Sequence, residues 1–91
     1  AVFACNFTNH FYALSEEILE KNGMNLDILK PLIKKTAANI LTDHPKALQT
    51  GPAKRNDTKV MQEHLELLDK LSPELKKLYA DVSESIIKMH Q

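Results

Sequence analysis

Two helices can be read directly from the stretch VMQEHLELLDKLSPELKKLYADVSESIIKM, which runs from Val60 to Met89. Its apolar residues recur at spacings of three and four, which places them on one face of a helix. Ser72-Pro73-Glu74 interrupts the pattern with a capping serine, a proline suited to the first helical position and an acid in the first turn. The stretch predicts one helix ending near Leu71 and a second from Pro73 to Met89, with apolar faces made of Val60, Met61, Leu67, Leu68 and Leu71, and of Leu75, Leu78, Tyr79, Val82, Ile86 and Met89.

The first part of the chain repeats this helical spacing. Phe3, Phe7, Phe11, Leu14 and Ile18 predict a helix to about Lys21, which Asn22-Gly23 ends with Gly23 in a left-handed conformation.

A second helix is predicted from the apolar residues between Leu26 and Leu41, capped by Asn25 or Asp27 and ended by Asp43-His44-Pro45. Pro31 fits only its first turn and would otherwise kink it.

A loop from Lys46 to Asp57 connects the two halves, with one short helical turn expected near Ala47 and Leu48. Since the chain contains no alternating apolar and polar run typical of a strand, the predicted fold is all-α: a compact bundle of four main helices plus that short turn.

Length and charge limit the function classes. A chain of 91 residues fits one small domain, and 12 basic residues balance 12 acidic ones, which argues against binding to nucleic acid or to an anionic membrane surface. No apolar run is long enough to span a membrane. The single cysteine, Cys5, fits a reducing compartment, so we expect a cytoplasmic protein.

Common catalytic and cofactor motifs are absent from the sequence. The four histidines, His10, His44, His64 and His90, lack zinc-binding spacing, which predicts no metal site. There is no glycine-flanked serine elbow. With two glycines, the chain can form neither a dinucleotide fingerprint nor a phosphate loop, so we expect it to bind no cofactor alone.

Polar residues beside the apolar faces are candidates for a site. Asn6, His10 and Glu17 fall on one side of the first predicted helix. They either form a wetted helix edge or line a cleft, where His10 would act as a donor or general acid. His64 lies between Val60 and Leu67 on an apolar face, so it is either a half-buried core histidine or a catalytic residue.

The run Thr50-Gly51-Pro52-Ala53-Lys54-Arg55-Asn56-Asp57 combines turn formers, cations and hydrogen-bonding side chains just before a helix. Either it breaks one helix and caps the next through Asn56 or Asp57, or it contacts a ligand or a partner. Ala1 is not a methionine, and no capping residue precedes the first helix. We therefore expect the chain to be part of a longer protein.

Four segments together resemble a known family: Val2-Phe3-Ala4-Cys5-Asn6-Phe7, Leu32 through Asn39-Ile40-Leu41, Leu48 through Asp57, and His64-Leu65. The chain resembles the helical C-terminal domain of unknown function that follows a Rossmann-like domain in NAD(P)-dependent oxidoreductases. That domain is similar in fold to the C-terminal domains of the 6-phosphogluconate dehydrogenase superfamily. The resemblance covers nearly the whole chain, and its most specific part is the run from Thr50 to Asp57 with His64-Leu65 after it.

The resemblance implies a parent protein whose N-terminal dinucleotide-binding domain holds NADP or NAD and is absent from this chain. Residues 1–91 would then form a single helical C-terminal domain that closes one wall of a small-molecule substrate cleft and forms a homodimer interface. Asn6 matches an asparagine that orients the substrate in the wider superfamily, whose catalytic lysine would lie before Ala1. The family's motif positions match Asn39, Thr50, Arg55, Asp57 and His64. Arg55 would either clamp a substrate carboxylate or phosphate or pair with Asp57.

The alternative to an enzyme domain is a free-standing helical module for protein interaction or dimerisation, with no catalytic role. As a dimerisation module, the stripe of Phe3, Phe7 and Phe11 on the first helix, or the apolar face of the last helix, would pack across a two-fold axis. As an interaction module, a groove of the helical fold would take a partner helix.

Overall fold

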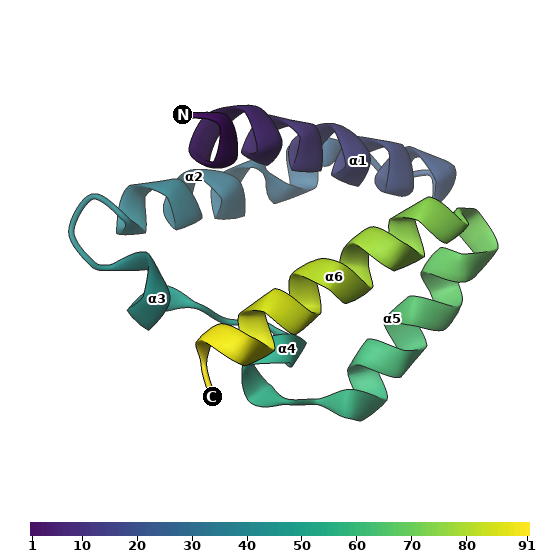
Figure 1. Cartoon of the computed structure of the whole chain (residues 1–91). Helices are drawn as coiled ribbons and strands as arrows, with labels where there is room; N and C mark the ends of the chain where they lie inside the picture. Colours follow the sequence, from purple (N-terminus) through teal and green to yellow (C-terminus); the bar gives the residue numbers. More distant parts are fainter. The chain divides into compact units, whose positions relative to one another are not determined.

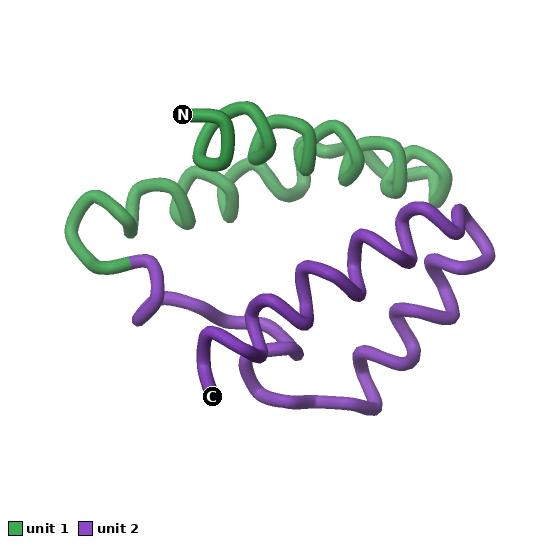
Figure 2. The backbone as a smooth tube through the Cα atoms, viewed as in Figure 1, with its two compact units in different colours: residues 1–44 green, residues 45–91 purple.

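The computed structural model describes residues 1–91 and contains helices and their connections, without strands (Figure 1). The predicted all-α fold is confirmed. The chain divides into two compact units, Ala1–His44 and Pro45–Gln91 (Figure 2).

The first unit opens with a helix that changes type along its length. Val2–Phe7 forms a π-helix, η1, and Thr8–Lys21 continues as the α-helix α1. The Ala1 carbonyl accepts from the backbone N–H of Cys5 at 2.8 Å and of Asn6 at 3.4 Å, so both the four-residue and the five-residue turn are present. The rings of Phe3 and Phe7 lie 5.2 Å apart between centroids. The predicted end of this helix at Lys21 is confirmed.

A glycine-dependent cap ends α1. Gly23 has φ 71°. The Met24 N–H donates to the Leu19 carbonyl at 2.9 Å, and the Gly23 N–H donates to the Glu20 carbonyl at 3.1 Å. This pair of bonds is a Schellman motif, which satisfies carbonyls that the helix end leaves free. The predicted left-handed role of Gly23 is confirmed.

The second predicted helix is shorter than expected. A 3₁₀ turn, η2 (Leu26–Leu29), comes first, with the Asn25 side chain accepting from the Asp27 N–H, and α2 then covers Lys30–Asn39 with Pro31 in its first turn. The prediction that the helix reaches Leu41 and ends at Asp43-His44-Pro45 is wrong. The Thr42 hydroxyl has the Asn39 carbonyl at 3.4 Å and Asp43 Oδ2 at 3.2 Å as acceptors for its one proton, and such local side-chain bonds compete with helical ones.

The second unit contains four helices. They are α3 (Pro45–Leu48), α4 (Pro52–Arg55), α5 (Thr58–Leu71) and α6 (Pro73–Met89). The short turn at Ala47 and Leu48 is confirmed as α3, and the last two helices have the predicted bounds. The predicted loop from Lys46 to Asp57 is wrong in one respect, because it contains α4 as a second helical turn.

Antiparallel packing of α5 on α6 forms the centre of the second unit, and α4 contacts both (Figure 1). Ser72 caps α6 by accepting from the Leu75 N–H at 3.5 Å, as its position before Pro73 predicts. Near this turn, Lys76 Nζ of α6 lies 3.8 Å from Asp69 Oδ1 of α5. The two buried apolar residues are Ala53 of α4 and Met61 of α5, with 7% and 9% of their surface exposed. No helix of the chain has the length and apolarity needed to cross a membrane.

Candidate functional site

The short helix α4 positions the first two polar residues of the candidate site. Gly51 precedes it with φ 101° and ψ 170°, Pro52 occupies its first turn, and Asn56 ends it in the left-handed conformation with φ 56°. Pro at the start and Asn just past the end of a helix are well suited to these positions. The chain therefore turns sharply between Arg55 and Asp57, which brings their side chains together.

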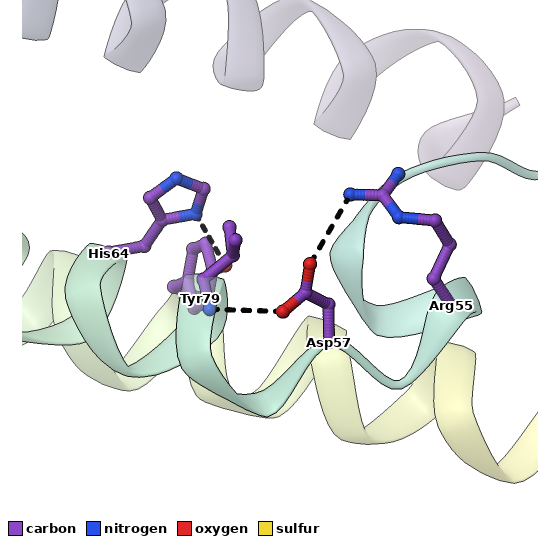
Figure 3. A network of polar contacts seen from close by, with 5 residues as sticks. Arg55, Asp57, His64 and Tyr79 are labelled. Atoms are coloured by element: carbon purple, nitrogen blue, oxygen red, sulfur yellow. Dashed lines mark hydrogen bonds and ion pairs between the residues drawn. The ribbon is translucent and has the colours of Figure 1, made fainter.

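Asp57 uses both of its carboxylate oxygens. Oδ1 accepts from the Val60 N–H at 3.2 Å and so caps α5. Oδ2 lies 3.9 Å from Arg55 Nη2, and the Arg55 side chain remains largely exposed (Figure 3). Of the two predicted caps, Asn56 and Asp57, the structure selects Asp57. Because the ion pair is long and exposed, it holds the guanidinium only weakly.

His64 follows Asp57 by two helical turns, on the same side of α5 (Figure 3). Its Nδ1 lies 2.8 Å from the Tyr79 hydroxyl of α6. The two rings meet edge to face, with centroids 5.6 Å apart and an interplanar angle of 86°. His64 is exposed, so the expectation of a half-buried core histidine is wrong. It lies at the rim of the α5–α6 contact, where the Tyr79 hydroxyl is its hydrogen-bond partner.

Tyr79 is the site residue that sequence reasoning missed. Its position on the apolar face of α6 indicates a core residue, and it is partly buried there. Burial raises the pKa of its phenol above the ordinary value of about 10, and the hydroxyl is therefore protonated at neutral pH, as an unshifted phenol would be. The feature of the sequence that could have identified Tyr79 is its hydroxyl, because a tyrosine on an apolar helix face usually forms a hydrogen bond with a nearby side chain or backbone group.

A groove of about 300 Å³ runs between α5 and α6 beside this pair. Tyr79 forms part of its wall. The other residues that line it include both apolar and polar side chains: Thr58, Met61, Gln62, Leu65, Ala80, Ser83, Glu84 and Ile87.

The other predicted site residues are all exposed: Thr50 in the second unit, and Asn6, His10 and Asn39 in the first. Thr50 precedes α4, and its carbonyl accepts from Gln49 Nε2 at 2.9 Å. In the first unit, Asn6 lies in η1, His10 in α1 and Asn39 at the end of α2. The side chains of Asn6 and His10 make no hydrogen bond within the chain. The structure thus brings Arg55, Asp57 and His64 to one side of α5, while roles for Asn6, His10, Asn39 and Thr50 stay predictions.

A family model described as "Domain of unknown function (DUF2520)" matches residues 1–86. The chain belongs to the DUF2520 family. The resemblance found in the sequence is confirmed.

The DUF2520 domain described here is also similar to part of a solved structure. That structure is the crystal structure of a "putative NADP oxidoreductase" from Bacteroides fragilis, with 45% sequence identity and a TM-score of 0.92. The match covers 96% of this chain and 33% of that one, so this chain spans about a third of the length of that protein. None of the curated proteins matches the chain.

The geometry of the DUF2520 site suits recognition of a polar ligand. Arg55 offers an exposed cation and His64 an exposed ring, while Asp57 and Tyr79 each contact one of them. No three His, Cys, Asp or Glu side chains lie close enough to hold a metal ion.

Proposed function

We propose that this chain is the helical C-terminal domain of an NAD(P)-dependent oxidoreductase, in which it supplies dimer contacts and part of a substrate cleft. One observation carries the proposal: the chain matches a third of a "putative NADP oxidoreductase" with 45% identity and a TM-score of 0.92. The remaining two thirds of such a protein leave room for a dinucleotide-binding domain. NADP is the cofactor that the description of this relative favours.

The substrate cleft is proposed for the side of α5 that carries Arg55, Asp57 and His64. Arg55 would bind an anionic substrate group, because a guanidinium can engage a carboxylate or phosphate through two N–H groups. The weak contact with Asp57 supports this role, since a 3.9 Å ion pair leaves the guanidinium free to take a closer partner. We propose His64 as a second contact to the substrate on this side of α5. Separately, and on the resemblance in sequence alone, we propose Asn6 and His10 of the first unit as catalytic residues of the parent enzyme.

The dimer contact is proposed for the aromatic stripe, defined as Phe3, Phe7 and Phe11. These side chains are 81%, 51% and 41% exposed. Successive members are four residues apart, and the rings of Phe3 and Phe7 are adjacent. Exposed aromatic side chains that recur along one helix are typical of a protein contact. The same surface would serve a free-standing dimerisation module, which is the second candidate function.

The two candidate functions differ in cofactor binding. Isothermal titration of NADPH into the protein expressed from the complete gene tests them, with the 91-residue chain as the control. The oxidoreductase proposal predicts binding by the complete protein and none by the chain. Absence of NADPH and NADH binding by the complete protein would overturn it and leave the dimerisation module.

A further inference from the structure

The contact between His64 and Tyr79 joins two helices through a pair of side chains fifteen positions apart in sequence. Tyr79 Oη and His64 Nδ1 are 2.8 Å apart, and the edge-to-face packing of the rings restricts how either can rotate. His64 Nδ1 is the hydrogen-bond partner of the Tyr79 hydroxyl within the chain, and His64 Nε2 has none.

The chemistry of the two groups assigns a direction to this bond. A phenol is one O–H donor, and burial raises the pKa of Tyr79 further above neutrality, so the proton is present. A neutral imidazole carries a proton on only one nitrogen, and the hydrogen bond at the other nitrogen decides which one. If the phenol donates to Nδ1, the proton of the imidazole lies on Nε2.

We propose that Tyr79 is a positioning residue that holds His64 in the Nε2–H tautomer. The ring then presents an N–H donor on its exposed edge, suited to an oxygen acceptor of a ligand, such as a carbonyl or carboxylate oxygen. The use of this donor for a substrate rests on the proposed function, whereas the tautomer itself depends only on the contact with Tyr79.

Nitrogen-15 NMR of histidine tests the proposal, because long-range ¹⁵N–¹H correlations distinguish a protonated ring nitrogen from a bare one. The protein from the complete gene is labelled with ¹⁵N-histidine and studied near pH 8, above the ordinary histidine pKa of about 6.5. His64→Gln identifies the His64 signals. Tyr79→Phe removes only the hydroxyl, and Tyr12→Phe is the matched control, because Tyr12 is the other tyrosine of the chain.

The wild-type protein should show the Nε2–H form of His64 as the major tautomer. In Tyr79→Phe the ratio of the Nε2–H form to the Nδ1–H form should fall about fivefold, because a hydrogen bond of ordinary net strength changes an equilibrium by about that factor. In Tyr12→Phe the ratio should stay unchanged. A major Nδ1–H form in the wild-type protein would overturn the proposal, even if Tyr79→Phe failed to fold. An unchanged ratio in a folded Tyr79→Phe would also overturn it. Neither result depends on NADPH binding, so the proposed function fails or stands separately.

Discussion

Among the single residues of the candidate site, Asp57 contacts both Arg55 and the first turn of α5, the helix that carries His64. One carboxylate oxygen caps α5, and the other faces Arg55 at 3.9 Å. A cap replaces a hydrogen bond that the first turn of a helix lacks, whereas an exposed ion pair contributes little to stability. The capping contact should therefore dominate what Asp57 contributes to folding.

Substitution of Asp57 separates these two contributions. Asp57→Ala should lower the free energy of unfolding by about 1 kcal/mol, the usual effect of losing a side-chain cap. Asp57→Asn keeps an oxygen that can accept from the Val60 N–H and removes the charge, so it should stay within about 0.5 kcal/mol of the wild type. Urea denaturation followed by circular dichroism measures both. Equal losses in the two variants would show that the charge, and not the cap, is what matters.

His90 makes the stability of the chain depend on pH. Its Nε2 is inaccessible to solvent and has no hydrogen-bond partner. Burial, together with the charges of Lys54 and Lys46, lowers its pKa below the ordinary value of 6.5. The folded state therefore prefers neutral His90, and the unfolded state binds more protons below pH 6.5. This contribution to stability is present above pH 6.5 and is lost as the pH falls through the folded-state pKa.

Thermal melting between about pH 7.5 and pH 5 tests this dependence. The melting temperature of the wild-type protein should decrease more steeply toward acid than that of His90→Gln, which cannot titrate at this position. Identical slopes for the wild type and His90→Gln would rule out His90 as the group responsible.

At the scale of elements, two glycines adopt positive φ for different reasons. Gly51, before α4, has φ 101° and ψ 170°, a region that is essentially restricted to glycine. Gly23, after α1, has φ 71°, in the left-handed region that asparagine also tolerates. A Cβ at either position would meet open space, so the backbone conformation alone sets the cost of a substitution.

Gly51→Ala should lower the free energy of unfolding by about 1–3 kcal/mol, because alanine must adopt a strained conformation before α4. Gly23→Asn is the matched comparison and should cost clearly less, since asparagine often ends helices in the left-handed conformation. Chemical denaturation of both variants provides the measurement. If Gly51→Ala were as stable as Gly23→Asn, residue 51 would have to adopt a backbone conformation that alanine accepts without strain, contrary to the φ and ψ in the structure.

The elements also show how far the sequence could predict the fold. Helices α5 and α6 were predictable because periodicity and the caps at Asp57 and Ser72 agree. The end of α2 at Asn39 was not, because Thr42 and Asp43 form local bonds that an apolar pattern does not reveal. Helix α4 was missed although Pro52 and Asn56 are good boundary residues, since one turn is too short to show a period.

The candidate site was predictable only in part for a similar reason. Arg55, Asp57 and His64 stand close in sequence, and the resemblance to a known family marked all three. Tyr79 comes from another helix, and only the packing of α6 on α5 brings its hydroxyl to His64. A contact of this kind depends on the packing of two helices, which the spacing of residues within one helix does not contain.

At the scale of the whole molecule, the chain buries few of its apolar side chains. Ala53 and Met61 are the buried apolar residues, and both belong to the second unit. The first unit has no buried residue. Fully burying a phenylalanine stabilises a protein or complex by about 1.5–3 kcal/mol relative to leaving the side chain exposed. Burial of the aromatic stripe against a partner surface would therefore stabilise a complex substantially. A second copy of the protein is the partner that we propose.

Light scattering across concentrations, on the protein expressed from the complete gene, shows whether this domain holds two copies of the protein together. The wild-type protein should be a dimer, and Phe7→Asp should raise the dissociation constant at least tenfold, because a charge replaces a buried ring in both copies. Leu67→Asp on α5, where the leucine is 53% exposed, should leave the dimer intact. A wild-type monomer at every concentration, or a dimer that Phe7→Asp does not weaken, would contradict the claim.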